Sequence, residues 1–187
     1  MYLLVILTIL GALSYYIYNK KYTSKKKITV CFSPRGCGEK LLISKINKAK
    51  KYIYVAIFSF TNSKIARALI NARKRGVKVY VIVDEGQLHN KHIRNLIRKL
   101  IRNGIIVKAK RGTGGGLMHH KYAVIDGKIV LTGSYNWTYS AENRNDENLI
   151  CLENYQTVAK KYLNNFSSLW KQKYKLCNNQ KLVLSKS

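Results

Sequence analysis

A histidine and a lysine two residues apart, His119 and Lys121, form the strongest chemical pattern in the chain. Residues two apart on a β-strand point to the same face, so we expect these side chains to project together while His120 points away. An imidazole can attack or protonate a group that a neighbouring ammonium holds, and a lysine supplies a compact positive charge for phosphate oxygens. The pair therefore indicates phosphoryl chemistry.

A second polar cluster follows downstream at Gly133, Ser134 and Asn136. Ser134 and Asn136 are again two apart and can both donate hydrogen bonds to a phosphoryl oxygen, while Gly133 permits close approach of the backbone. Further along, Glu147 could orient an imidazole and stabilise its charged form. Asp126 begins an Asp-Gly hairpin-turn signal, so we assign a structural role to Asp126 and to Gly133.

Taken singly, each of these residues could be a turn former or a solvated surface group. Together they match one long pattern: His, any residue, Lys, four residues, Asp, six residues, Gly-Ser, any residue, Asn. This pattern resembles the HKD signature of the phospholipase D superfamily. The chain most resembles the single-motif branch, the Nuc-type endonucleases, with mitochondrial phospholipase D or Zucchini proteins as relatives. The resemblance covers about residues 27–173.

The resemblance implies a two-step phosphoryl transfer that needs neither a metal nor another cofactor. His119 would attack phosphorus and form a phosphohistidine, and a second histidine would protonate the leaving oxygen. Lys121, Asn136 and Ser134 would stabilise the developing negative charge, and Glu147 would hold the imidazole. Double displacement needs a nucleophile and a separate acid, yet the pattern supplies one histidine. We therefore expect an obligate homodimer with one shared site, in which a twofold partner contributes its own copy of His119.

The charge balance points to a polyanionic partner. Thirty-five Lys and Arg against eight Asp and Glu give a formal charge of +27, which suits nucleic acid or an anionic membrane surface. We expect a non-specific endonuclease that cleaves single- or double-stranded DNA or RNA. The alternative is a phospholipase D-type hydrolase of an anionic phospholipid such as cardiolipin. A second alternative is a non-catalytic nucleic-acid-binding protein with a decayed site, against which the complete motif argues.

The periodicity of apolar residues predicts an α/β domain whose mixed β-sheet is flanked by helices on both faces. Strands and helices alternate in the first half, which favours parallel crossovers, and a hairpin follows in the second half. We predict strands at 28–32, 52–59, 77–83, 105–109, 121–125, 128–131 and 148–152. We predict helices at 36–50, 62–75 and 90–103, and a long final helix capped by Asn154. Four polar residues at strand ends could line the cleft: Asn62, Ser63, Asp84 and Gln87.

The first 18 residues are almost wholly apolar and uncharged, which predicts an N-terminal hydrophobic helix that crosses a membrane. We divide the chain into a membrane anchor or uncleaved signal at 1–19, a basic linker at 20–27, a catalytic domain at 28–177 and a flexible tail at 178–187. The lysines that follow the anchor favour the cytoplasmic face of the membrane, with a periplasmic or secreted domain as the alternative.

Two of the four cysteines, Cys31 and Cys37, could form a small disulfide loop if the domain faces an oxidising compartment. The sequence leaves this open. Cys151 lies in an apolar run and is predicted to be a core residue. The cysteines lack the closely spaced pairs that are typical of a zinc site, so we expect no bound metal.

Overall fold

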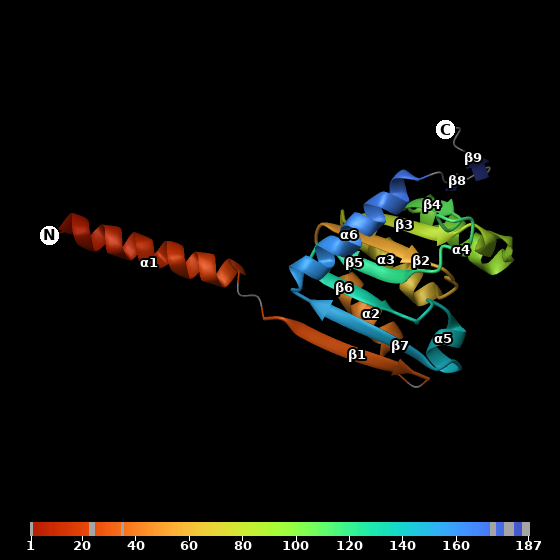
Figure 1. Ribbon diagram of the computed structural model, residues 1–187, viewed down its shortest axis with the longest axis horizontal. Helices are drawn as coiled ribbons and strands as arrows, with labels where there is room; N and C mark the ends of the chain where they lie inside the picture. The colour runs from red at the N-terminus through yellow and green to blue at the C-terminus, as the bar shows by residue number, and fades with distance from the viewer. Residues whose placement is uncertain (1, 23–24, 35, 173–174, 178–181, 185–187) are drawn as a thin grey trace.

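The computed structural model describes residues 2–22, 25–34, 36–172, 175–177 and 182–184 of the 187-residue chain (Figure 1). Its centre is a nine-stranded mixed sheet with the order β1-β7-β6-β5-β2-β3-β4-β8-β9. The strands are β1 (Lys27–Ser33), β2 (Tyr52–Ile57), β3 (Lys78–Asp84), β4 (Ile106–Lys110), β5 (Lys121–Ile125), β6 (Ile129–Gly133), β7 (Glu147–Glu153), β8 (Lys175–Cys177) and β9 (Leu182–Leu184).

The two halves of the chain build two kinds of strand pairing, as predicted. Strands β2, β3 and β4 run parallel, because each crossover between them passes through a helix. Strands β5 and β6 form an antiparallel hairpin, and β5 pairs antiparallel with β2. The prediction of a mixed α/β sheet is therefore confirmed.

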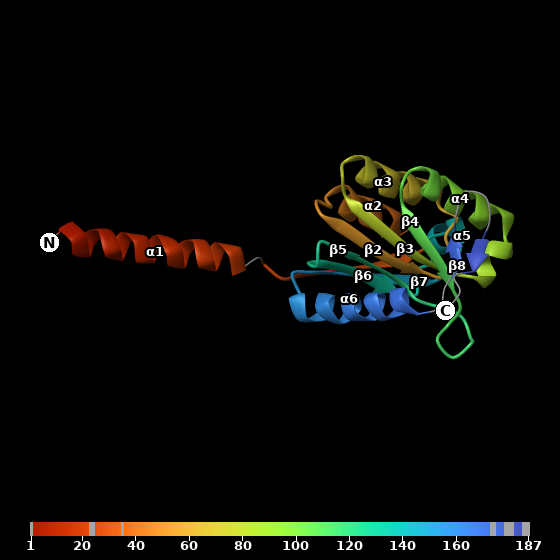
Figure 2. The same cartoon turned by 90° about the horizontal axis from the view of Figure 1, so that it is seen from above.

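Helices cover both faces of the sheet, also as predicted (Figure 2). Helices α2 (Gly38–Asn47), α3 (Ser63–Lys74) and α4 (Lys91–Arg102) lie on one face, and α6 (Gln156–Lys171) lies on the other. On α4 the apolar residues recur at helical spacing, so Ile93, Ile97 and Leu100 are buried while the lysines and arginines face solvent. Two separate apolar clusters result, one under each helical layer.

Four short elements were not predicted: a 3-10 turn η1 (Gly86–His89), the helix α5 (Tyr139–Asn143), strand β8 and the edge strand β9. The predicted cap of the last helix is wrong by one residue. Tyr155 precedes α6, whereas Asn154 has a positive φ of 65° and donates its side-chain amide to the carbonyl of Lys25. Asn154 thus turns the chain between β7 and α6, a conformation that asparagine tolerates well. The predicted flexible tail lies partly outside the described residues.

The N-terminal segment forms a helix, α1 (Tyr2–Tyr22), that extends away from the domain (Figure 1). Within the described part of the chain, however, no helix combines the length and the apolar character needed to cross a membrane. The predicted membrane anchor, and the localisation drawn from it, are therefore corrected.

Candidate active site

One end of the sheet collects the ends of β1, β2 and β6 and the starts of β5 and β7. The residues predicted to act on the phosphate lie at or next to this end, whereas Asp126 does not. Pairing sets Lys121 at the start of β5 opposite Ile57 at the end of β2, and Gly133 at the end of β6 opposite Leu149. Glu147 at the start of β7 pairs with Ser33 at the end of β1. Residues far apart in the sequence are thus collected at one end of the domain by the register of the sheet.

His119 and Lys121 form one cluster with Phe58. The His119 ring lies 4.5 Å from the Phe58 ring, between centroids, and the Lys121 ammonium lies 5.1 Å from the same ring centroid. Lys121 Nζ also donates to the carbonyl oxygen of His119, at 2.8 Å. Burial lowers the pKa of Lys121, and the charge of Glu147 partly opposes this effect. The structure therefore brings the imidazole and the ammonium to one place.

Gly133 brings the Ser134 turn against β7. Its φ is +152°, and a Cβ at this position would lie 2.2 Å from the carbonyl oxygen of Asn148. That oxygen accepts hydrogen bonds from the backbone N–H of Ser134 and of Tyr135. In return, Ser134 Oγ accepts from the Asn148 backbone N–H, at 3.0 Å. A side chain on Gly133 would separate these partners, so the close approach requires glycine.

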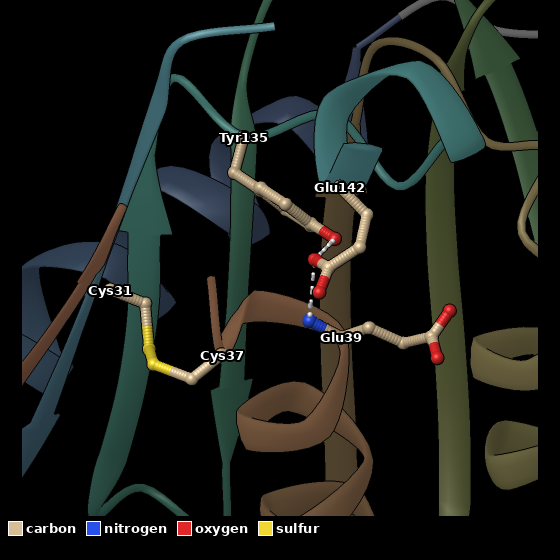
Figure 3. The surroundings of a disulfide bond; sticks show 5 residues. All are labelled: Cys31, Cys37, Glu39, Tyr135 and Glu142. Atoms are coloured by element: carbon tan, nitrogen blue, oxygen red, sulfur yellow. Dashed lines mark hydrogen bonds between the residues drawn. A yellow bond between two sulfur atoms is a disulfide. The ribbon is translucent and has the colours of Figure 1, made fainter. Parts of the chain in front are cut away.

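Tyr135, the residue after Ser134, anchors this turn to the neighbouring elements (Figure 3). Tyr135 is buried, and its hydroxyl donates to the carboxylate of Glu142 on α5. Glu142 also accepts from the backbone N–H of Glu39, at the start of α2. Next to this contact, a disulfide between Cys31 and Cys37 ties β1 to the residue that precedes α2. The two cysteines that could pair do form a disulfide in the structure. The bond links β1 to the start of α2, next to the contact between Glu142 and Glu39.

Asn136 and Glu147 both have polar partners other than His119. Asn136 Oδ1 accepts from the backbone N–H of Ser59, at 3.3 Å, which orients the side-chain amide at the end of β2. Glu147 Oε1 accepts from Asn145 Nδ2, at 3.0 Å. The role expected of Glu147, which is to hold an imidazole, stays a prediction. In the structure Glu147 is bonded to Asn145 and is close enough to Lys121 to affect the pKa of that lysine.

Asp126 lies at the opposite edge of the sheet, in the β5–β6 turn. Its φ is +53°, and its two carboxylate oxygens accept from the backbone N–H groups of Lys50, Lys51 and Tyr52 at 2.8, 2.8 and 3.0 Å. The carboxylate thus fixes the chain at the start of β2. No part of it faces the cluster around His119, so the contacts of Asp126 are architectural.

A pocket of about 360 Å³ opens beside the cluster. It is lined by nine residues from β5, the two residues before it, β6 and α6: His119, His120, Lys121, Tyr122, Thr132, Gly133, Lys161, Tyr162 and Asn165. His119 and Lys121 contact Phe58, whereas the His120 ring packs against Tyr122, so His120 has different neighbours from the other two, as expected. The pocket lies at the end of β5 and is lined by all three. The α6 residues carried no signal in the sequence, since only the packing of α6 on the sheet brings them here.

Asp84, one of the four polar residues that were predicted to line the cleft, supports the segment before His119. It is 1% exposed, and its Oδ2 accepts from the backbone N–H of Met118, at 2.9 Å, which anchors the residue directly before His119. Its other oxygen, Oδ1, is buried without a hydrogen-bond partner. Gln87 lies in η1 and does not line the pocket.

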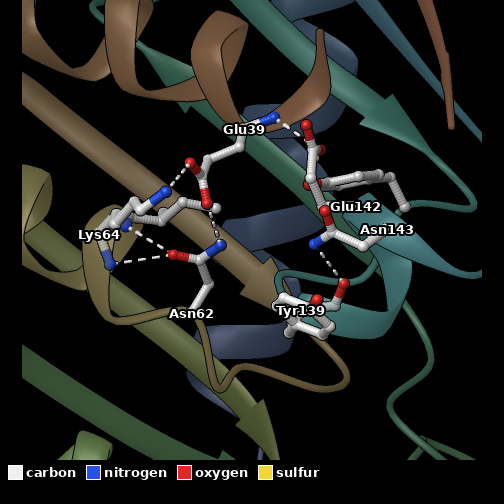
Figure 4. A network of polar contacts seen from close by, with 8 residues as sticks. Glu39, Asn62, Lys64, Tyr139, Glu142 and Asn143 are labelled. Atoms are coloured by element: carbon white, nitrogen blue, oxygen red, sulfur yellow. Dashed lines mark hydrogen bonds and ion pairs between the residues drawn. The ribbon is translucent and has the colours of Figure 1, made fainter. Parts of the chain in front are cut away.

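Asn62 and Ser63 line a different pocket, of about 430 Å³, around Glu39 (Figure 4). Asn62 caps α3 through its Oδ1 and donates its amide to Glu39, which also pairs with Lys64 at 2.9 Å. Burial raises the pKa of Glu39, but these hydrogen bonds outweigh it, and the pKa ends below its usual value. The Glu39 carboxylate and the Asn62 side chain are thus engaged in contacts that join the start of α2 to the start of α3.

Comparison with known proteins identifies the family. The family model described as "Cardiolipin synthase, PLD-like domain" matches residues 42–170. A protein named phospholipase D from Rickettsia conorii is 37% identical over 157 residues, which are 84% of this chain and 76% of the relative. A mitochondrial cardiolipin hydrolase from Xenopus tropicalis is 34% identical over 125 residues, 67% of this chain and 57% of the relative.

The solved structures agree. The phospholipase D family member Nuc from Salmonella typhimurium superimposes with a TM-score of 0.78 and 29% identity, over 82% of this chain and 99% of that one. NucT from Helicobacter pylori has a TM-score of 0.67 and 29% identity, over 79% of this chain and 97% of that one. The chain belongs to the phospholipase D superfamily. It is a phosphodiesterase of that superfamily, which overrules the alternative of a non-catalytic binding protein.

Proposed function

We propose that the chain is a metal-independent endonuclease that hydrolyses DNA or RNA without strong sequence preference, at a site completed by a second copy of the chain. The net charge of +27 is the observation that favours nucleic acid as the substrate. A phosphodiesterase with so large an excess of positive charge binds a polyanionic backbone well. The pocket beside His119 supports the same substrate, since its lining contains no carboxylate that would repel a phosphate.

In the proposed first step, an imidazole nitrogen of His119 forms a bond to phosphorus while the bond from phosphorus to the leaving oxygen breaks. A protonated imidazole of the partner subunit's His119 gives its proton to that oxygen. In the second step water attacks phosphorus, the partner's imidazole takes the proton, and the phosphorus–nitrogen bond breaks. Both histidines then return to their starting states.

Lys121, Asn136 and Ser134 would stabilise the negative charge on phosphorus. Lys121 has three N–H donors and uses one on the carbonyl of His119, which leaves two for phosphate oxygens. Asn136 has its Oδ1 engaged by Ser59, so its Nδ2 is the end available to a substrate. These donors are already oriented before substrate binds, which is what electrostatic stabilisation of a transition state requires.

A second chain is needed because this chain does not supply a suitable acid. His120 lines the pocket, but burial lowers its pKa, and the charges of Lys110, Lys121 and His119 lower it further. These effects disfavour the charged form of His120, which is the form that could act as the general acid. Three apolar side chains at or near the site edge are also well exposed, namely Phe32 at 69%, Tyr139 at 64% and Leu117 at 55%, which suits a surface covered by a second copy.

Hydrolysis of an anionic phospholipid is the second candidate. It is favoured by relatives named phospholipase D and mitochondrial cardiolipin hydrolase, and by the same exposed apolar side chains, which could meet lipid instead of protein. Positive charge would assist at an anionic bilayer as well. Both candidates hydrolyse a phosphodiester, and they differ in whether that phosphodiester belongs to a nucleic acid or to a phospholipid.

A substrate panel separates them. The purified protein is incubated in excess chelator with single-stranded DNA, double-stranded DNA, RNA and cardiolipin vesicles, with His119→Asn as the matched control. We expect nucleic-acid cleavage by the parent protein, and a loss of at least about 1,000-fold in His119→Asn because the nucleophile is removed. Lipid turnover without nucleic-acid cleavage would transfer the assignment to the second candidate. Equal activity of the variant would refute the mechanism.

A further inference from the structure

Helix α6 forms a wall of the pocket that contains His119. It contributes Lys161, Tyr162 and Asn165 to the lining, to which His119 and Lys121 also belong. None of these three α6 residues belongs to the sequence motif. They become part of the site only because α6 packs across β5 and β6, on the face of the sheet opposite α2, α3 and α4 (Figure 2).

The α6 wall is fixed by hydrogen bonds to the strands. The buried Tyr122 donates its hydroxyl to Asn165 Oδ1, at 2.8 Å, and the Tyr162 hydroxyl donates to Thr132 Oγ1, at 3.2 Å. The two tyrosine rings meet edge to face, with centroids 4.9 Å apart, and the His120 ring lies 5.3 Å from Tyr122. Three aromatic rings therefore line the pocket in set positions.

The chemical nature of the lining selects its ligand. It consists of imidazoles, ammonium groups, phenols, a hydroxyl, an amide and one glycine, with no aliphatic side chain. An acyl chain would remove the ammonium groups of Lys121 and Lys161 from water without giving them an anionic partner, which is unfavourable. A nucleotide instead offers a base to aromatic rings, hydroxyls to amides and a phosphate to a lysine.

We propose that this pocket is a nucleotide subsite, which receives the nucleotide next to the bond that is cleaved, with Lys161 binding the neighbouring phosphate. Lys161 is exposed and lines the same pocket as Lys121, so two ammonium groups are available to neighbouring phosphates of one strand. The inference rests on the proposed endonuclease function and names the part of the substrate that the site recognises.

The adjacent Lys160 provides a matched control. It lies on the same helix and is also exposed, but it does not line the pocket. Lys161→Ala and Lys160→Ala therefore remove the same charge from the same turn of α6, and neither change touches the core. General attraction between a basic protein and DNA is lowered equally by both, whereas a specific phosphate contact is lost only in Lys161→Ala.

The test compares two short single-stranded oligonucleotides with each enzyme. One has ordinary phosphates, and the other carries an uncharged methylphosphonate at the linkage next to the cleaved bond. For the parent protein and Lys160→Ala we expect the neutral linkage to raise KM about threefold to tenfold, as for a single phosphate contact. For Lys161→Ala we expect the ratio of the two KM values, neutral linkage over ordinary linkage, to fall to about one. The ammonium group that would bind the phosphate charge is absent from this variant.

The outcomes are distinct. A ratio that stays the same in Lys161→Ala as in Lys160→Ala would overturn the subsite while the endonuclease function stands. Failure of the parent protein to cleave either oligonucleotide, together with turnover of cardiolipin, would overturn the proposed function and the subsite with it. Loss of the ratio in Lys161→Ala alone would support both.

Discussion

Replacing Asp126 with Asn tests whether this residue of the motif stabilises the fold or takes part in the reaction. The carboxylate accepts three backbone N–H groups, two at Oδ1 and one at Oδ2. Asn keeps the shape and tolerates the positive φ of 53°, but one of its two ends donates and cannot accept. With the amide oxygen in the Oδ1 position, the hydrogen bond from Lys50 is lost, and the other two lose the contribution of the negative charge.

We expect this change to lower the free energy of unfolding by about 2 kcal/mol, since charge-assisted hydrogen bonds contribute about 1.5–3 kcal/mol and two of these three are exposed to water. For a domain of this size that corresponds to a fall in Tm of about 4–8 °C. The turnover number, measured at 25 °C where the variant is folded, should stay within about threefold of the parent value, because the carboxylate lies far from the cluster around His119.

The assay is thermal unfolding followed by steady-state cleavage of a fluorescent oligonucleotide, with His119→Asn alongside. That control should show the reverse result, a lost turnover number and a Tm within about 1 °C of the parent, because surface side chains contribute little to stability. An Asp126→Asn protein with an unchanged Tm and a turnover number reduced by about 100-fold or more would refute the reasoning and give the carboxylate a part in the reaction.

Two other predictions concern the shared site and His120. If each active site needs two copies of His119, then equal amounts of parent and His119→Asn chains, refolded together, should give about one quarter of the activity of an all-parent sample, as opposed to about one half for independent sites. For His120, the lowered pKa means that the unfolded chain binds a proton more readily than the folded chain. Stability is therefore complete above pH of about 6.5 and falls as the pH drops toward the folded pKa. A Tm measured from pH 8 to 5 should fall less in His120→Asn than in the parent, and coincident profiles would contradict this.

The fold could be predicted from local patterns to a large extent. Helical spacing on α4, the β-branched run of β2 and the Asp-Gly turn between β5 and β6 are each decided by neighbouring residues, and the structure contains all three. The cap of α6 was misjudged because asparagine suits both a helix cap and a positive-φ turn, and the contact of Asn154 with Lys25 is a long-range one. The apolar N-terminal segment was read as a membrane anchor from composition alone, and the structure does not support that interpretation.

The sequence alone indicated the class of reaction, because the spacing of the motif resembles one superfamily of phosphodiesterases, and the comparisons confirm that membership. The register of the sheet places His119, Lys121 and Ser134 at or next to the same end of the strands. Tertiary structure alone decided what surrounds them, because sheet register and helix packing join residues that have no sequence relation. It brought Lys161 and Asn165 into the pocket that His119 lines, bonded Asp84 to the backbone of Met118, and placed Asp126 at the other end of β5. These long-range contacts depend on how whole elements pack, and no local pattern encodes them.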